Sequence, residues 1–422
     1  MAKIKHVRTN VLIIGGGLSG LALAGALGEA GVDCVCIDRA PPVTQLTETY
    51  DGRTTAISYA SHLVLKTAGA WETMLPDCEP IRDIRVADGA SPFYLHFSHD
   101  DDGNEKYDPG REAPPFGWII ENRILRHRLF NNVKRLKKHV RHIAPAEIRE
   151  FIRGKNDVGV ILEDGARITA PLMIGADGRN SAVRQWLGIG VKNADYKQSA
   201  IVCNVAHELD HENAAVEHFR SAGPFAVLPM TRGAQGEHRS SVVWTEHGTD
   251  TKEILSLNAE DFDARLQELF GPHLGAVRHI SKPMSYPLGL MHADSYIGAR
   301  VALMAEAAHA IHPIAGQGLN LSLRDVAVLT ELIFEHLRCG LDPGGDTLLQ
   351  KYQSARRGDT LLMAGVTDLL NRLFSNDLTT VRLIRGLGLG IVHKIPPLKR
   401  YFARQAMGIS GIMKKSLRKA TN

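Results

Sequence analysis

The fold is decided by residues 11–38, VLIIGGGLSGLALAGALGEAGVDCVCID, in which an apolar run meets a cluster of glycines. Residues 11–14 have the composition of a buried strand. Residues 21–31 predict a helix of small side chains that ends at a glycine, and residues 35–37 predict a second strand. The order strand, tight turn, helix, strand is the βαβ unit from which dinucleotide-binding sheets are built.

The glycines of this unit have separate tasks. Gly15 permits the tight turn, Gly17 lets the backbone approach a pyrophosphate, and Gly20 lets the helix lie close to the strand. The first turn of the helix offers unpaired N–H groups to phosphate. Asp38, after the second strand, is placed to accept hydrogen bonds from a ribose diol. The pattern predicts an adenine dinucleotide without separating FAD from NAD.

Composition excludes several classes of protein. The chain has 422 residues, 44% of them hydrophobic and 23% charged, as expected of an ordered globular protein. A formal net charge of +4 gives no reason to expect nucleic acid as a partner. The five cysteines are scattered, which favours reduced thiols and a cytoplasmic location, and Cys34 and Cys36 are expected to be buried in a sheet. No apolar stretch is long enough to predict a transmembrane helix or a signal peptide core.

Two later segments repeat the plan of an apolar strand, a polar loop and a helix. The run 170–176 ends at Asp177-Gly178, and Ser181 is placed to cap the following helix. The run 301–304 leads through a loop to the Gly-Gln-Gly segment 316–318, where a second helix is expected to begin. Ligands of open α/β sheets bind at the carboxyl ends of the strands. Both loops are therefore predicted to face the dinucleotide.

Together the three segments resemble the class A flavoprotein aromatic hydroxylases, the family of para-hydroxybenzoate hydroxylase. The first unit is similar to that family's ADP-binding fingerprint and Asp177-Gly178 to its DG motif. Residues 305–320, AEAAHAIHPIAGQGLN, are similar to its flavin motif G-D-A-A-H-x-x-x-P-x-x-G-Q-G-x-N. One departure is Ala305-Glu306 in place of Gly-Asp, whose Asp hydrogen-bonds the ribityl chain of the flavin in the family. Glu306 is one methylene longer, which leaves its ribityl contact open.

The resemblance implies an α/β fold with three parts. A Rossmann-like FAD-binding domain of the glutathione-reductase type is expected from residues 1–80, 111–188 and 286–345. An antiparallel β-sheet substrate domain is expected from residues 81–110 and 189–285, roofing the flavin. A C-terminal helical region with a basic tail is expected over residues 346–422.

Glu306, His309 and His312 raise the alternative of a metal site, because they stand three residues apart. A catalytic metal needs imidazoles brought together on one face and usually further donors. Pro313 and the glycines that follow prevent regular structure across this loop. Since the flavin motif accounts for the same residues, we expect no metal.

Two further segments are similar to the ubiquinone-biosynthesis hydroxylases within this family. They are the D-x-R-x-x-A-[IL]-[ST] segment at 51–58 and the C-terminal pattern T-D-x-L-x-R-L-F-S-N…P-P-L-K-R…R-Q-A-M-G, which begins at Thr367. The resemblance implies an FAD-dependent monooxygenase that hydroxylates the aromatic ring of a polyprenylated phenol. In that cycle FAD is reduced by NADPH or another electron donor, and O2 gives the flavin C4a-hydroperoxide that transfers oxygen to the ring.

The resemblance also assigns residues to the site. Those expected to bind the cofactor are Gly15, Gly17, Leu18, Ser19, Gly20, Asp38, Arg39, Arg53, Asn122, Arg126, Asp177, Gly178, Glu306, Gly318, Leu319 and Asn320. Those expected to form the catalytic flavin loop are Pro313, Gly316, Gln317 and Gly318. No Tyr or His is singled out by its spacing as the base that acts on the phenol.

The C-terminal stretch from Leu378 onward contains ten Lys or Arg and no acidic residue. Its apolar residues recur at helical spacing, which suggests contact with an anionic membrane surface. A packed helix with a solvated basic end is the equal alternative. The candidate partners are thus a polyprenylated phenol, a ubiquinone-biosynthesis protein complex and the inner face of the cell membrane.

Two other functions stay open at the level of sequence. One is a catalytically idle flavin-binding subunit of a quinone-synthesis complex. The other is a monooxygenase that acts on a soluble aromatic compound.

Overall fold

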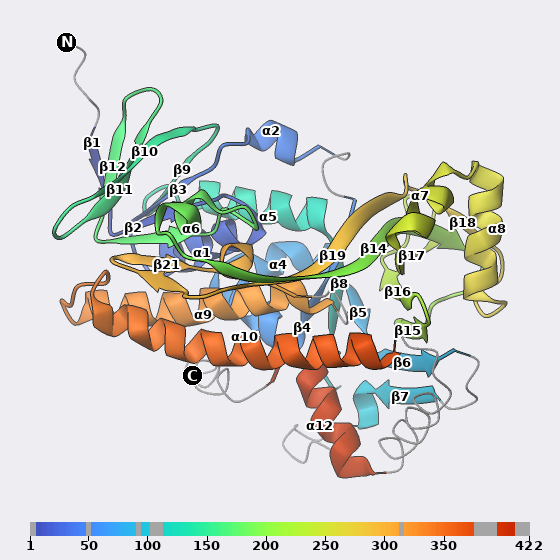
Figure 1. Cartoon of the computed structure of the whole chain (residues 1–422). Helices are drawn as coiled ribbons and strands as arrows, with labels where there is room; N and C mark the ends of the chain where they lie inside the picture. The colour runs from blue at the N-terminus through green and yellow to red at the C-terminus, as the bar shows by residue number, and fades with distance from the viewer. Residues whose placement is uncertain are drawn as a thin grey trace.

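The computed structural model describes residues 6–47, 52–89, 94–101, 113–311, 316–374 and 395–409 (Figure 1). Within these residues no helix is both long and apolar enough to cross a lipid bilayer. The described helices and strands form one α/β structure with four sheets. The sequence predicted this α/β fold class.

A six-stranded sheet forms the centre of the dinucleotide-binding part. Its strands in spatial order are β20 (Ile297–Gly298), β21 (Val301–Leu303), β13 (Leu172–Gly175), β2 (Val11–Ile14), β3 (Cys34–Ile37) and β9 (Val140–Ile143). All neighbouring pairs are parallel except β20 with β21. Every residue of β2, β3 and β13 is buried, because helices and neighbouring strands cover both faces. Cys34 and Cys36 are buried free thiols, as predicted.

Helices pack on this sheet and on each other. They are α1 (Leu18–Glu29), α3 (Tyr59–Thr67), α4 (Trp71–Met74), α5 (Asn122–Arg135), α9 (Gln317–Arg338) and α10 (Asp346–Phe374). α1 lies between α5 and α9. It begins three residues before the predicted 21–31, because the turn is already complete at Gly17.

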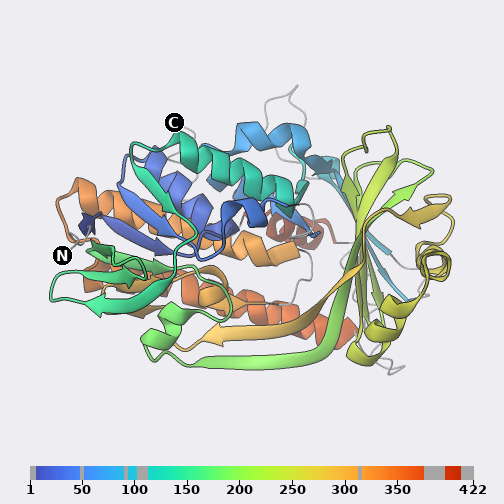
Figure 2. The same cartoon turned by 90° about the horizontal axis from the view of Figure 1, so that it is seen from above.

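The second large sheet has nine strands and roofs the molecule on one side (Figure 2). Its strands are β22 (His309–Ala310), β19 (Met284–Ala293), β14 (Val191–His207), β17 (His238–His247), β16 (Gly223–Met230), β15 (Ala214–Arg220), β6 (Asp83–Asp88), β7 (Tyr94–Ser98) and β18 (Val277–His279). Its far face is covered by α7 (Gly248–Ser256) and α8 (Ala259–Phe270), with Phe262 and Leu266 packed against Trp244.

The sheet departs from the expectation in two details. The pair β15 and β6 is parallel, whereas the sequence suggested antiparallel strands throughout. Strand β19 continues to Ala293, and β22 brings part of the predicted flavin motif into the same sheet. The division into domains by residue range stays a prediction, and these strands tie the expected parts together.

Two small sheets complete the fold. One is β1 (His6–Arg8), β12 (Arg167–Ala170), β11 (Val158–Leu162) and β10 (Ile148–Arg153). The sequence analysis expected these residues in the FAD-binding domain but predicted no separate sheet there. The other is β4 (Thr54–Ser58), β8 (Gly117–Glu121) and β5 (Glu79–Ile81). Short helices α2 (Pro42–Gln45), α6 (Ala182–Trp186) and α12 (Pro396–Ala406) lie at the edges. Most of the predicted tail helix lies outside the described residues.

Candidate active site

A cavity of about 1480 Å³ lies between the carboxyl ends of the parallel strands and the nine-stranded sheet. This volume exceeds the range of roughly 300–1,000 Å³ that is common for small-molecule pockets. One end of the cavity is bordered by the first glycine loop, and the other by apolar residues of β6, β7 and α12. It can therefore hold a long ligand, or two ligands end to end.

The loop from β2 to α1 forms one end of this cavity. Gly15 has φ +109°, and a Cβ there would lie 2.3 Å from the carbonyl oxygen of Ala176. A Cβ on Gly20 would lie 1.9 Å from the carbonyl oxygen of Gly15, so glycine is required where α1 crosses the strand. Gly17 is different, because a Cβ there would meet nothing within 4 Å. The open side of Gly17, at the start of α1, is the place for a phosphate group.

Asp38 borders the same end of the cavity, but its carboxylate oxygens also accept hydrogen bonds from the protein itself. Its Oδ2 accepts a hydrogen bond from the Gly16 N–H at 2.6 Å, and its Oδ1 accepts from the N–H of Ala40 and from Gln45 Nε2. Asp38 therefore shapes the glycine loop as well as facing the cavity. Arg39, Leu18 and Ser19 line the cavity beside it.

The loop after β13 is held in place by its own side chains. Ser181 caps α6 by accepting a hydrogen bond from the Arg184 N–H, as the sequence predicted. Asp177 Oδ2 accepts from the Val183 N–H, while Asp177 Oδ1 is buried and has no hydrogen-bond partner. An unsatisfied buried acceptor at the cavity wall fits a ligand that brings a hydroxyl donor. Gly178 beside it has φ +82°.

Arg184 connects this loop to the third motif. Its Nη1 donates to the carbonyl oxygen of Ala307 at 2.9 Å, and its Nη2 donates to that of Arg179. The buried guanidinium thus joins two loops that are more than a hundred residues apart in sequence. The sequence analysis did not identify this residue, because nothing in its local pattern distinguishes it from an ordinary helix Arg.

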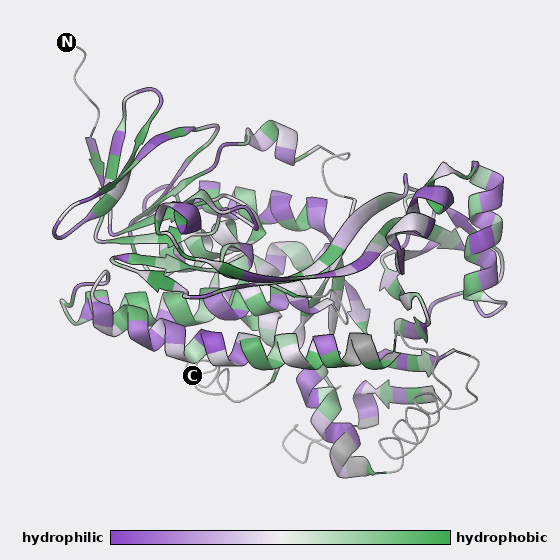
Figure 3. Ribbon diagram, in the orientation of Figure 1, coloured by the Kyte–Doolittle hydropathy of each residue, from purple (hydrophilic) through white to green (hydrophobic). Residues whose placement is uncertain are grey.

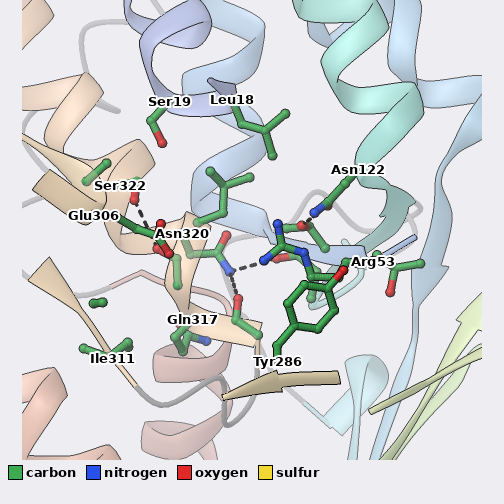
Figure 4. Close-up of a pocket in the computed structure, with 18 of the residues that line it drawn as sticks. Leu18, Ser19, Arg53, Asn122, Tyr286, Glu306, Ile311, Gln317, Asn320 and Ser322 are labelled. Carbon is green, nitrogen blue, oxygen red and sulfur yellow. Dashed lines mark hydrogen bonds between the residues drawn. The ribbon is translucent and has the colours of Figure 1, made fainter. Parts of the chain in front are cut away.

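The third loop leaves β21 and forms a short turn, η3 (Ala305–Ala307), before β22. Glu306 is exposed in this turn and lines the cavity (Figure 4). Helix α9 begins at Gln317, one residue before the expected start, after Gly316 in the left-handed conformation. Gln317, Gly318 and Leu319 line the cavity, so the amino end of this helix faces it. Pro313 and His312, two residues of the prediction, lie outside the described residues.

Asn320 holds the third loop against β4. Its Oδ1 accepts from the Ser58 N–H, and its Nδ2 donates to the carbonyl oxygens of Ala56 and Gly316. The side chain is almost fully buried. Its hydrogen bonds position the amino end of α9, which itself borders the cavity.

His309 belongs to a buried charge cluster. Its Nε2 lies 2.7 Å from Asp325 Oδ2, and Arg356 Nε donates to Asp325 Oδ1 at 2.6 Å. Burial by itself raises the pKa of the Asp325 carboxyl, but the charges and hydrogen bonds of His309 and Arg356 outweigh it and lower this pKa to about 2. Across the described segments, no three His, Cys, Asp or Glu side chains are grouped as metal ligands would be. Asp325 accounts for the position of His309.

Arg53, Asn122 and Arg126 lie on the wall opposite this loop. The Arg53 guanidinium carbon is 4.8 Å from the centre of the Tyr286 ring, and the two side chains lie side by side in Figure 4. The Asn122 N–H donates to the carbonyl oxygen of Arg53, and Thr55 Oγ1 donates to Asn122 Oδ1. Arg126 Nη1 contacts Gln45 Oε1 at 3.5 Å. Tyr286 carried no sequence signal, since it lies in an ordinary alternating strand.

Of the predicted site residues, all but two line the one cavity. The exceptions are Gly20, which is buried beneath the loop, and Pro313. An elongated, phosphate-bearing dinucleotide would suit three features of this cavity. They are the open side of Gly17, the Asp177 oxygen that has no hydrogen-bond partner, and the amino end of α9 at Gln317. Their role in binding it stays a prediction.

Comparison with known proteins points to FAD as this dinucleotide. Residues 8–360 match the protein-family model described as an FAD binding domain. The chain is 46% identical over 399 residues to the ubiquinone hydroxylase UbiL of Rhodospirillum rubrum, covering 94% of this chain and 89% of that protein. It is 31% identical over 403 residues to 3-demethoxyubiquinol 3-hydroxylase of Escherichia coli K12, covering 95% and 99%.

Solved structures agree in fold. p-Nitrophenol 4-monooxygenase PnpA of Pseudomonas putida superposes with a TM-score of 0.75 at 17% identity, over 96% of this chain and 99% of that one. PqsL of Pseudomonas aeruginosa, described as a probable FAD-dependent monooxygenase, gives 0.73 at 21% identity, over 90% and 99%.

Proposed function

The chain belongs to the FAD binding domain family, as a class A flavoprotein hydroxylase, and on this premise we propose that it hydroxylates the aromatic ring of a polyprenylated phenol in ubiquinone biosynthesis. It is an FAD-dependent monooxygenase, for which a nicotinamide cofactor and O2 are the usual cosubstrates. The observation that carries the choice of substrate is the two-part cavity, polar at the glycine loop and apolar at the far end. The names of the two relatives, both hydroxylases of ubiquinone or its precursors, support the same substrate class.

The polar end of the cavity would hold FAD. The pyrophosphate would lie against Gly17 and the amino end of α1, and Asp38 and Arg39 would face the adenosine. Asp177 and Glu306, from two different loops, would face the ribityl hydroxyls. The amino end of α9 would favour negative charge on the ring. Bound FAD supplies oxygen activation, which no amino-acid side chain offers.

The far end of the cavity suits the apolar part of the substrate. It is lined by Ile81, Ile84, Val86, Leu95, Phe97, Phe116, Ala215, Phe219, Leu228, Leu373, Phe402, Ala403 and Ala406. Burial of a prenyl chain against such a wall stabilises the complex by roughly 25 cal/mol for each Å² of apolar surface removed from water. An acidic or small soluble aromatic substrate would leave this wall unused.

The position of α12 supports entry of the substrate from a membrane surface. Phe402 lines the cavity and is also 43% exposed, so the cavity reaches the protein surface there. On the last turns of α10, Leu362, Val366 and Leu369 form an exposed apolar stripe, spaced as on one helix face. α10 and α12 meet where Leu373 and Ala403 pack in one apolar cluster.

Charge on α12 supports the same docking. Arg400 and Arg404 are exposed beside Tyr401, which is 57% exposed. Basic side chains next to exposed apolar ones favour an anionic lipid surface. A polyprenylated phenol resides in the bilayer, so a cavity mouth at this face would receive it directly. Figure 3 shows the mixture of polar and apolar residues along α10 and α12.

A turnover experiment tests the proposal. The purified chain is supplied with FAD, NADPH, isotopically labelled dioxygen and a polyprenylated phenol with a short tail. We expect phenol-stimulated NADPH oxidation and a product that carries one labelled oxygen atom in its ring. A chain that binds FAD but never oxidises NADPH with any such phenol would instead be the idle subunit. Equal turnover of a phenol without a prenyl tail would favour a soluble substrate.

A further inference from the structure

The face of the nine-stranded sheet that looks into the cavity is almost entirely apolar. Residues directly opposite one another in neighbouring strands point to the same side of a sheet. One such row crosses five strands and consists of Val86, Glu217, Ala226, Val243 and Val202, all of which line the cavity. Glu217 is thus a carboxylate in a row of four aliphatic side chains, and it faces the cavity.

Within the described residues, no hydrogen bond or ion pair explains the position of the Glu217 carboxyl group. It is the one carboxylate among the cavity-lining residues that the described strands of this sheet contribute, and these strands contribute no Lys or Arg to the cavity. A carboxylate set in an apolar cavity wall without a protein partner is costly, so its position suggests that a ligand satisfies it.

The surroundings of Glu217 also change its acidity. Burial away from water raises the pKa of the Glu217 carboxyl to about 7. Its direct neighbours across the strands are Val86 of β6 and Ala226 of β16. The other titratable or charged side chains that line the same cavity are Asp38, Arg39, Arg53, Arg126, Glu147, Asp177, Arg179, Tyr286, Glu306 and His309. A carboxyl group with such a pKa can both accept and return a proton near neutral pH.

We propose that Glu217 is the catalytic base that receives the hydroxyl proton of the phenol, an inference that rests on the proposed hydroxylase function. The phenol O–H bond breaks, its proton binds a Glu217 carboxylate oxygen, and the electron pair remains on the phenol oxygen. Electron density then rises at the ring carbons ortho and para to that oxygen, where the new C–O bond forms as the O–O bond of the activated dioxygen breaks. That carbon loses its hydrogen as a proton when the ring becomes aromatic again, and this proton leaves with the second oxygen atom in water. Glu217 returns its own proton to the phenol oxygen.

The overall reaction balances with the cosubstrates of the family. One oxygen atom of O2 enters the ring and the other leaves as water, while NAD(P)H supplies a hydride, with its two electrons, and is oxidised to NAD(P)⁺, and one proton is taken up from solution. Glu217 ends in the charge state in which it began, so it is a true catalyst.

The same residue predicts which head groups the enzyme accepts. A neutral phenol hydroxyl would donate to Glu217. An aromatic acid would bring a second carboxylate to an apolar wall to which the described strands contribute no Lys or Arg, which is unfavourable. The substrate class that fits is a neutral prenylated phenol whose hydroxyl, not a carboxylate, is recognised.

The test compares Glu217→Gln, Glu217→Asp and Tyr286→Phe with Glu253→Gln, a matched loss of charge at an exposed position on α7. We expect Glu217→Gln to lower kcat/KM for the phenol about 10²–10⁴-fold, the usual effect of losing a general base. Glu217→Asp should restore part of this loss. The flavin absorbance of each purified variant reports whether it is folded and loaded with FAD.

The pH profile separates a base from a merely structural residue. In the wild-type enzyme and in Glu253→Gln, kcat/KM should fall as pH drops below about 7, because the carboxylate becomes protonated. This acid limb should be absent from Glu217→Gln. An unchanged rate and limb in Glu217→Gln, or loss of the limb in Tyr286→Phe instead, would overturn the role of Glu217. A wild-type enzyme that hydroxylates no prenylated phenol would overturn the proposed function itself.

Discussion

At the scale of single residues, Asp325 of α9 joins three other segments of the site, the turn η3, strand β22 and helix α10. Its two oxygens receive hydrogen bonds from the Ala305 N–H and from Arg356, and its Oδ2 also lies 2.7 Å from His309 Nε2. Arg356 continues the cluster to Asp359 and to the carbonyl oxygen of Leu321. The turn that carries Glu306 is therefore held by a charge cluster in which Asp325, His309 and Arg356 are buried.

Replacing Arg356 by Leu should be severely destabilising. The substitution leaves the buried Asp325 carboxylate without its guanidinium partner, and loss of one member of a buried pair costs about 3–5 kcal/mol. Arg265→Leu is the matched control, since Arg265 and Glu268 form an exposed ion pair of the same i,i+3 spacing as Arg356 and Asp359. Its cost should be about 0.5 kcal/mol or less. Urea unfolding measures both, and equal midpoints would contradict the argument.

Asp325 should also contribute to acid unfolding. Its pKa in the folded protein is lowered to about 2, below the ordinary value of 3.8, so its contribution is complete above pH 3.8 and is lost as pH falls toward 2. The loss amounts to about 2 kcal/mol. The free energy of unfolding of Asp325→Asn, measured over the same interval, should fall less steeply with acid than that of the wild type. Parallel curves would show that Asp325 does not titrate as described.

At the scale of elements, the turn between β2 and α1 gives Gly17 and Gly20 different tolerance for a larger side chain. Gly17→Ala has room for its methyl group, so the free energy of unfolding without cofactor should change little, but affinity for FAD should fall where the methyl meets the pyrophosphate. Gly20→Ala meets the Gly15 carbonyl oxygen and should destabilise α1 itself. Thermal unfolding of the apo protein and FAD titration separate the two effects. Equal stability losses in both variants would contradict this division.

The same turn shows what sequence could predict about elements. The strands β2 and β3 and the helix α1 were predicted because their apolar patterns are continuous and their glycines have one steric explanation. The strands β10 to β12 were not predicted, because residues such as Arg149, Glu150 and Arg153 leave no clean alternation. The parallel pair β15 and β6 could not be predicted, since its register is set by tertiary packing between distant segments.

The sequence likewise predicted the loops of the candidate site, but not every side chain that faces the cavity. The three loops were expected together because parallel strands place their carboxyl ends at one edge, and all three border the cavity. Glu217 was missed, although Ala215, Glu217 and Phe219 alternate onto one face, because the facing cavity is formed only by the folded chain. Arg184 and Tyr286 were missed for the same reason.

At the scale of the whole molecule, the exposed stripe on α10 and the basic side chains of α12 predict reversible membrane binding. The double variant Leu362→Glu, Leu369→Glu should float less with anionic phospholipid vesicles than the wild type, because it places charge where Leu362 is 70% and Leu369 64% exposed. Leu209→Glu is the control, since Leu209 is 49% exposed at the end of β14. Added salt should weaken wild-type flotation. Equal flotation of all three proteins, or none of the wild type, would remove membrane docking from the proposal.

Strand β14 is 17 residues long and runs from beside the parallel sheet into the nine-stranded sheet, where it lies between β19 and β17 (Figure 2). It pairs with β19 along most of its length, with one break in register between Asp195 and Ser199. A cut at residue 190 would leave β14 with its partners β17 and β19, but it would separate β6 from β15 and β13 from β21. The backbone amides of these strands would lose their partners on both pieces, so neither part of the enzyme could be exchanged without exposing a sheet edge.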